Sequence, residues 1–150
     1  MEDKIRIRDI HQEDKMVFLE MAKKFYSSKA VAHNLDDHII ETTFEVAVSK
    51  SPLIRVLIIE DNDTPAGFAV LAFSYATEVG GKVVLLEDLY ISETYRGKGL
   101  GRKFIQFMEH EYLSAKRFRL EVKKENKKAI ELYCNLGYKP LNYIQMIKDI

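Results

Sequence analysis

The sequence has little of what disulfide-bonded, metal-binding and membrane-spanning proteins need. Its 150 residues include one cysteine, Cys134, three prolines and no tryptophan. A single cysteine cannot form an internal disulfide, and the four histidines show no metal-ligand spacing with other donors. No apolar run approaches the roughly 20 residues that cross a bilayer, and the charged start, Glu2-Asp3-Lys4, is unlike a signal peptide. We therefore expect a cytoplasmic protein with no metal site and no membrane contact.

The chain also lacks an excess of charge of either sign. Its 23 basic and 23 acidic residues cancel, so the net charge of the chain gives no general attraction to nucleic acid. Apolar residues make up 47% of the chain, which argues against disorder, and the length suits one domain with a buried core. We predict a single domain over residues 1–150 that binds no nucleic acid.

Hydrophobic periodicity predicts an α/β fold. Short turns join three middle strands, which should therefore be antiparallel, whereas a strand reached through a helix should be parallel to the strand before it. The result is a mixed, mostly antiparallel sheet of six to seven strands with helices on both faces. Strands are expected at residues 4–8, 55–60, 67–75, 83–91, 117–123, 138–139 and 143–148, and helices at 12–26, 38–49, 99–114 and 126–136.

A glycine-rich loop at residues 96–101 is the most informative segment. Gly97, Gly99 and Gly101 follow an apolar strand and open a helix, so unobstructed N–H groups and the positive end of the helix dipole meet at one place. Such a place receives a phosphate or pyrophosphate. The spacing excludes a P-loop, because no Ser or Thr follows Lys98, and it excludes a dinucleotide fingerprint, because the third glycine comes one residue early.

The strand before the loop carries a candidate base. Glu87, Leu89 and Ile91 should point to one face of the strand, and Asp88 and Tyr90 to the other. Neighbouring leucines should partly desolvate the carboxylate of Glu87 and raise its pKa, which suits a base near neutral pH. The alternative is that Glu87 or Asp88 only pairs with a lysine at the sheet edge.

The motif Arg-x-x-Gly-x-Gly, beginning at Arg96, resembles the acyl-coenzyme A loop of the Gcn5-related N-acetyltransferase (GNAT) superfamily, and the order of elements agrees over residues 4–148. Residues 86–91, Leu-Glu-Asp-Leu-Tyr-Ile, with Tyr95-Arg96-Gly97 after them, look like the spermidine/spermine N-acetyltransferase branch. There the acid nine residues before the loop arginine, here Glu87, sits in the active site. The resemblance implies an acyl-CoA N-acyltransferase fold, acetyl-CoA as co-substrate, and acetyl transfer to a primary amine by direct attack in a ternary complex.

The same resemblance implies roles for individual residues. Glu87 would be the catalytic base and Tyr133 the acid that protonates the leaving thiolate. Asn126 and Tyr133 match the family's Asn-x-x-Ala-x-x-Leu-Tyr-x-x-x-Gly helix, and the strand backbone would bind the pantetheine amides. The expected cofactor-binding residues are Leu89, Tyr90, Ile91, Arg96, Gly97, Lys98, Gly99, Leu100, Gly101, Arg102, Asn126 and Tyr133.

Some of these residues have plainer interpretations. Tyr133 could be a core tyrosine that packs its helix on the sheet. Lys98 and Arg102 could belong to a solvated basic helix start rather than screen phosphates. Cys134 could suggest an acyl-enzyme, but a lone cysteine on an apolar helix face more often packs.

The acceptor is less constrained by the sequence. The branch resemblance favours a small cationic amine such as a polyamine. Four acids on the expected second helix could attract a cation, or could simply cap the helix and face solvent: Asp36, Asp37, Glu41 and Glu45. The alternatives are a peptide or protein amine, and a non-catalytic acyl-CoA-binding module, which would need neither Glu87 nor Tyr133.

The end of the chain suggests self-association. Residues 143–147, Tyr-Ile-Gln-Met-Ile, alternate weakly and would leave an apolar or pairable edge. Together with the frequent dimerisation of the resembled family, this predicts a homodimer.

Overall fold

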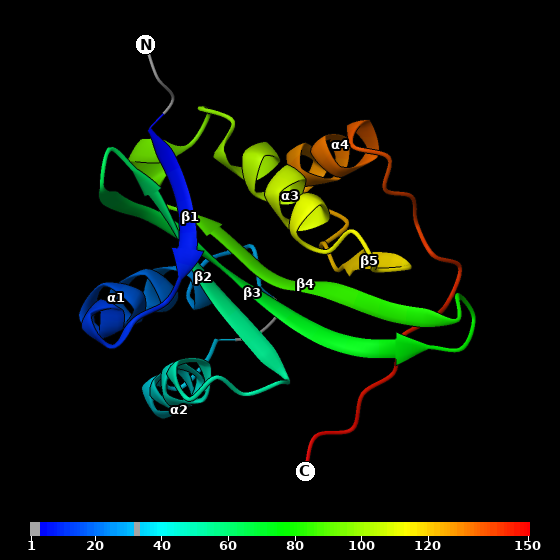
Figure 1. Cartoon of the computed structure of the whole chain (residues 1–150), viewed down its shortest axis with the longest axis horizontal. Helices are drawn as coiled ribbons and strands as arrows, with labels where there is room; N and C mark the ends of the chain where they lie inside the picture. Colours follow the sequence, from blue (N-terminus) through cyan, green and yellow to red (C-terminus); the bar gives the residue numbers. More distant parts are fainter. Residues whose placement is uncertain (1–3, 32–33) are drawn as a thin grey trace.

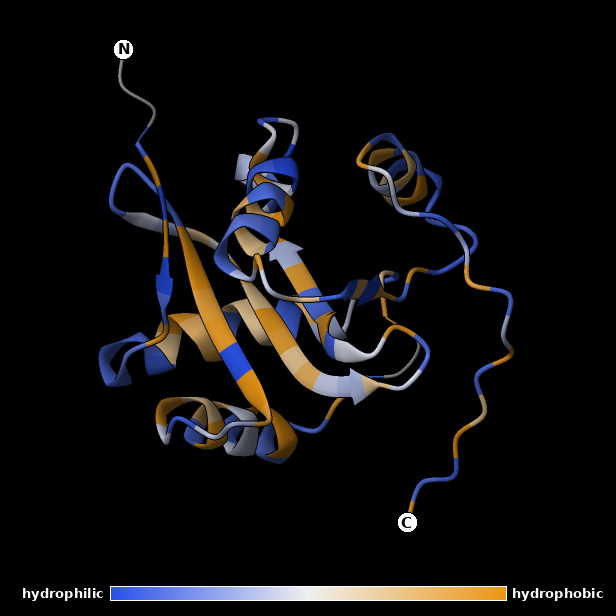
Figure 2. Cartoon of the chain, turned by 45° about the vertical axis from the view of Figure 1, so that its right-hand side comes forward, coloured by the Kyte–Doolittle hydropathy of each residue, from blue (hydrophilic) through white to orange (hydrophobic). Residues whose placement is uncertain are grey.

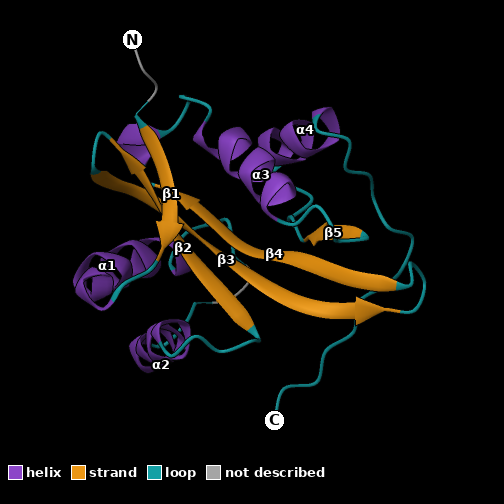
Figure 3. Cartoon of the chain, in the orientation of Figure 1, coloured by secondary structure: helices purple, strands orange, loops and turns teal. Residues whose placement is uncertain are grey.

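The computed structural model describes residues 4–31 and 34–150, and a five-stranded sheet dominates them (Figures 1 and 3). The strands lie side by side in chain order. The first four are antiparallel neighbours, and the fifth is parallel to the fourth. The predicted mixed sheet and parallel crossover are therefore confirmed. The strands are β1 (Ile5–Asp9), β2 (Ile54–Asp61), β3 (Thr64–Ala76), β4 (Gly81–Ile91) and β5 (Arg117–Leu120).

Helices cover both faces of the sheet, as predicted. Two of them pack on one face, and the other two lie on the opposite side (Figure 1). The first pair is α1 (Lys15–Tyr26) and α2 (Asp37–Val48); the second is α3 (Leu100–Glu111) and α4 (Lys127–Asn135). Two 3-10 turns, η1 (Gln12–Asp14) and η2 (Glu93–Tyr95), precede α1 and α3.

The central strands are apolar on both sides because both sides are covered. In β2, Val56 and Ile58 join the core under α1 and α2, whereas Leu57 and Ile59 join the core under α3. All four are buried, and Figure 2 shows the same apolar character along the central strands. A continuous apolar run, rather than strict alternation, is what a doubly covered strand requires.

The last two predicted strands are wrong. Residues 138–139 and 143–148 form no strand, so the sheet of the described chain has five strands rather than six to seven. β5 also ends at Leu120, where 123 was expected. The weak alternation near the C-terminus is real, but residues 139–150 are all exposed and have no neighbouring ladder. A segment without a partner strand has nothing to stabilise it as a strand.

None of the helices in the described ranges combines the length and apolar character that crossing a bilayer would require.

Candidate active site

Glu87 is the extra residue of a β-bulge. The register with β3 pairs Val70 with Asp88 and Leu71 with Leu86, so Glu87 has no opposite residue. The bulge also reverses the alternation of faces. Leu86 and Leu89, three apart, both contribute to the core under α3, whereas Tyr90 packs under α1. Leu89 and Tyr90 thus point to opposite faces of the strand, as predicted. The bulge determines the direction in which Glu87, the candidate base, points.

The gap between β4 and β5 opens at the same place. Their parallel pairing runs from Val83 with Arg117 to Leu86 with Leu120 and then stops. Beyond it, residues 87–91 continue β4 with β3 as their neighbour on one side. The backbone groups on the other side are therefore available to an amide-rich ligand that takes the place of a strand.

Three carboxylates lie where this pairing ends: Glu87 and Asp88 follow the last paired residue of β4, and Glu121 follows the last residue of β5. Glu87 is solvent-exposed, but neighbouring atoms remove part of its hydration, and together with the nearby charge of Glu121 this raises its pKa. Burial raises the pKa of Asp88 to about 6; the hydrogen bond from Tyr26 opposes that rise, and the charge of Glu87 adds to it. Tyr26 ends α1, and its hydroxyl donates to Asp88 Oδ2. Glu87 and Asp88 thus bind protons more readily than usual.

The glycine loop forms a cavity at the start of α3. Gly97 and Gly99 have φ angles of 78°, a left-handed conformation that glycine adopts readily, and a Cβ on either would project into open space. Gly99 is the N-cap of α3, so the free N–H groups of the first turn lie beside this space. The cavity measures about 240 Å³. Its lining is Ile91, Tyr95, Arg96, Gly97, Gly99, Leu100, Gly101, Arg102 and Leu132.

These features fit the predicted acetyl-CoA. The loop could hold the pyrophosphate on backbone N–H groups with Arg102 beside it, and the edge of β4 could bind the pantetheine amides. The predicted residues Ile91, Arg96, Gly97, Gly99, Leu100, Gly101 and Arg102 are brought together here.

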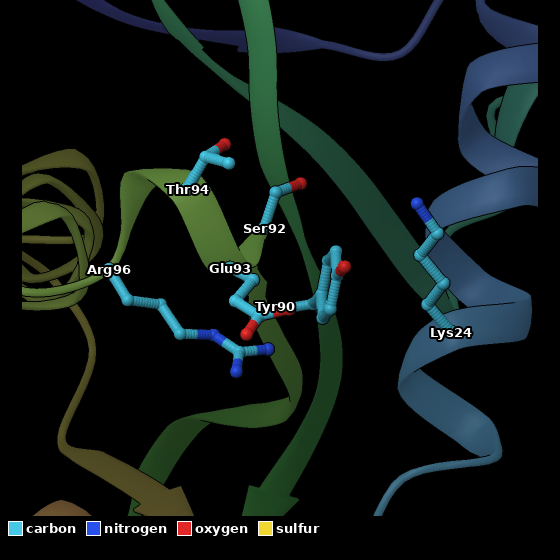
Figure 4. Close-up of a pocket in the computed structure, with 6 residues that line it drawn as sticks. All are labelled: Lys24, Tyr90, Ser92, Glu93, Thr94 and Arg96. Atoms are coloured by element: carbon cyan, nitrogen blue, oxygen red, sulfur yellow. The ribbon is translucent and has the colours of Figure 1, made fainter.

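Lys98 and Tyr90 lie outside this cavity, and Arg96 also reaches a second one. Lys98 is absent from the cavity lining and places its Nζ 5.3 Å from the Tyr95 ring centroid. Tyr90 is buried under α1 and lines a second cavity of about 370 Å³ with Lys24. Arg96 lines both cavities: its Nε donates to the carbonyl of Ile91 at 2.8 Å, and Figure 4 shows it extending from the loop towards Tyr90. Arg96 therefore braces the loop against the end of β4.

Helix α4 borders the site with its predicted residues. Asn126 is its N-cap, and the side-chain oxygen accepts from the Ala129 N–H at 3.3 Å. Tyr133 packs against the core under α3, and burial raises its pKa. A Cβ on Gly101 would lie 3.7 Å from Leu132 and 3.9 Å from Leu89, so α3, α4 and β4 meet closely at this glycine. Tyr133 itself lies outside the lining of either cavity, and its raised pKa keeps the hydroxyl protonated, as a proton donor requires.

Three of the four acids noted on the second helix have structural partners, and the third of these, Glu45, lies 3.6 Å from Lys15. Asp36 caps α2 by accepting from the His38 N–H at 2.9 Å, which confirms the capping interpretation. Asp37 lies 3.4 Å from Lys23. Cys134 is exposed, so the packing interpretation of that residue is wrong.

Sequence reasoning missed two features of the site. Tyr26 lies 62 residues before Asp88, and nothing local links them. The bulge at Glu87 has no glycine or other marker in β4. The one available signal was that two acids interrupt a stretch, residues 83–91, that is otherwise apolar.

Comparison with known proteins decides the family. Residues 7–138 match the model of the acetyltransferase (GNAT) family. The chain belongs to that family. The superfamily resemblance seen in the sequence is therefore confirmed. So is the predicted enzyme class, an acetyl-CoA-dependent N-acetyltransferase.

Relatives of this GNAT protein carry acetyltransferase names. It is 29% identical over 147 residues to the thialysine N-epsilon-acetyltransferase of Mus musculus, with 91% of this chain and 85% of the relative covered. Among solved structures, the aminoglycoside N-acetyltransferase AAC(6')-Iy in complex with CoA superposes with a TM-score of 0.80 at 14% identity, covering 99% and 97% of the two chains. Glucosamine-6-phosphate N-acetyltransferase from Arabidopsis thaliana gives 0.70 at 24%, with 97% of each covered. These two structures show that the fold is shared.

The described part of this GNAT protein contains no group of three or more His, Cys, Asp or Glu side chains that could hold a metal ion. That the reaction needs no metal stays a prediction.

Proposed function

We propose that this protein transfers the acetyl group of acetyl-CoA to a primary amine of a small cationic molecule, such as a polyamine, by direct attack in a ternary complex. The observation that carries the proposal is that Glu87, Asp88 and Glu121 follow the last paired residues of β4 and β5, with the charge of Glu121 acting on Glu87 and that of Glu87 acting on Asp88. Three neighbouring carboxylates favour a cation over a neutral acceptor.

Two residues would manage the protons. Glu87 takes a proton from the ammonium form of the acceptor, directly or through water. The amine nitrogen then forms a bond to the acetyl carbonyl carbon as the carbon–sulfur bond breaks, and the extra proton left on that nitrogen passes to water, which gives the neutral amide. Tyr133 supplies the proton that the departing thiolate needs, and its raised pKa keeps the hydroxyl protonated until then. We also propose that the enzyme acts in the cytoplasm as a homodimer of single-domain chains.

Names of relatives support a small-molecule acceptor. The mouse relative is named for acetylation of thialysine. A second relative, 28% identical over 114 residues and covering 69% of this chain and 66% of its own length, is named streptothricin acetyltransferase and comes from Escherichia coli. Neither is named for a protein substrate.

Thiol release from acetyl-CoA across a panel of amines tests the proposal. Spermidine and other small diamines should react faster than an N-terminal peptide amine or a lysine-containing peptide at equal concentration. Faster reaction with a peptide would favour the peptide or protein alternative. Binding of acetyl-CoA without thiol release from any amine would favour the non-catalytic module.

A further inference from the structure

The second cavity, between α1 and the end of β4, has no part in the proposed reaction. It measures about 370 Å³, against about 240 Å³ for the cavity at the glycine loop. Sites for small molecules occupy roughly 300–1,000 Å³, so this cavity is large enough for a small ligand. Its lining is Lys24, Tyr90, Ser92, Glu93, Thr94 and Arg96, which is mostly polar.

One of the two cations of this cavity is Arg96, which follows β4. Its Nε donates to the carbonyl of Ile91 at 2.8 Å, and its guanidinium carbon lies 5.9 Å from the Tyr90 ring centroid. Within residues 4–31 and 34–150, its two terminal nitrogens have no hydrogen-bond acceptor and no carboxylate at ion-pair distance. The free end of the guanidinium is therefore available to an anion that enters the cavity.

The other cation, Lys24, belongs to α1. Figure 4 shows Lys24 and Arg96 on opposite sides of the Tyr90 ring. The Nζ of Lys24 lies 3.5 Å from Glu20, one turn earlier in the helix, and both side chains are mostly exposed. An exposed pair of this spacing contributes little to stability, so Lys24 can exchange it for a ligand at small cost.

The remaining polar groups of the lining define the kind of ligand. Lys24 and Arg96 contribute two positive charges and Glu93 one negative charge, so the lining is cationic in sum. Ser92 and Thr94 add two hydroxyl donors, and neither hydroxyl is used in a hydrogen bond within the described chain. Ammonium, guanidinium and hydroxyl groups together are the donors that bind phosphate and carboxylate oxygens. Glu93 opposes such an anion, so its charge should weaken binding.

We propose that this cavity binds a small molecule through its phosphate or carboxylate group, with the negative charge held between Lys24 and Arg96. The hydroxyls of Ser92 and Thr94 would donate to the oxygens of that group. Because Arg96 lines both cavities, the ligand would bind next to acetyl-CoA without taking its place. The site would be present whichever amine accepts the acetyl group.

Calorimetric titration with three matched probes tests the class of ligand. Glycerol 3-phosphate, glycerate and glycerol are titrated in saturating CoA, which occupies the glycine loop. The two anions should bind, more weakly as salt is added, and glycerol should not. The tighter anion identifies the group as phosphate or carboxylate. Binding of neither anion, or equal binding of glycerol, overturns the proposal. So does an anion that binds only without CoA and is lost in Gly99→Asp, because it occupies the loop instead.

Two substitutions in the lining should act in opposite directions. Lys24→Gln should weaken binding of the anion about tenfold or more, because it removes a charged donor. Glu93→Gln should strengthen it about threefold or more, because it removes a like charge. The matched control is Lys23→Gln, since Lys23 is the neighbouring lysine of α1, lies outside the lining and is 3.4 Å from Asp37. Equal losses in Lys24→Gln and Lys23→Gln, or a loss in Glu93→Gln, overturn the site. Thiol release from acetyl-CoA by the same variants reports separately on the proposed acetyl transfer.

Discussion

Glu87 owes its candidate role to its place in the bulge, and its raised pKa predicts a pH dependence. Glu87→Gln should lower turnover about a hundredfold or more at neutral pH and below, where the amine carries a proton that the glutamine cannot take. Activity should partly return as the pH approaches the pKa of the amine. The measurement is the pH profile of kcat, with Glu93→Gln, an acid of the second cavity, as control. A flat profile in Glu87→Gln would indicate that water removes the proton.

Tyr133 can be separated from its neighbour Tyr138, whose ring centroid is 6.2 Å away. Tyr133→Phe should reduce kcat about ten- to a hundredfold while the dissociation constant of acetyl-CoA changes little, because the hydroxyl acts on the leaving group. Tyr138→Phe removes a hydroxyl that donates to Glu109 and should leave kcat unchanged. Similar losses in both variants would mean that the tyrosines only pack α4.

The ionised carboxylate of Asp88 should lower the free energy of unfolding at neutral pH. Its pKa is about 6 in the folded chain against an ordinary 3.8. The unfolded chain therefore ionises first, and the free energy of unfolding falls as the pH rises between these values. Asp88→Asn should raise the free energy of unfolding by about 2–3 kcal/mol at pH 7 and by little at pH 4. Urea unfolding at both pH values measures this, with the exposed turn variant Asp63→Asn as control. Destabilisation of Asp88→Asn at both pH values would contradict it.

At the scale of an element, the start of α3 is the feature on which cofactor binding depends. Gly99→Asp would place a carboxylate in the open space beside the first turn of the helix and should abolish the thermal shift that acetyl-CoA causes. Gly80→Asp is a matched control, because Gly80 also has a positive φ and open space but lies in the β3–β4 turn. If Gly99→Asp binds acetyl-CoA as well as Gly80→Asp does, the loop is not the pyrophosphate site.

Local patterns explain which elements could be predicted. The glycine loop, the two hairpins joining β2 to β4 and the helices each have a signal within their own residues, so their positions were predicted to within a few residues. The bulge at Glu87 and the contact of Tyr26 with Asp88 depend on residues far apart in the chain, and the two acids that interrupt the apolar run of β4 specify neither. The terminal strands failed for the same reason, since their pattern specifies an apolar segment but not its partner.

At the scale of the whole molecule, the order of strands in the sheet is the order of strands in the chain. β2, β3 and β4 are joined by two short turns, so the central pairs form from residues close together in sequence. β5 is separated from β4 by the 25 residues between Ile91 and Arg117, which form the loop and α3. β5 is thus joined to the sheet by one short parallel pairing, whereas α3 is attached through the buried residues that it packs on the sheet.

This arrangement has a consequence for folding kinetics. Contacts between residues close in sequence cost little entropy, because the loops they close are short. The meander of β2, β3 and β4 should therefore form early and open last. α4, which has no buried residue, should open first. Native-state hydrogen exchange should therefore show the slowest amides in β3 and the fastest helical amides in α4, and acetyl-CoA should slow those of α4 selectively. Binding would then complete the folding of the half of the protein that holds the ligand.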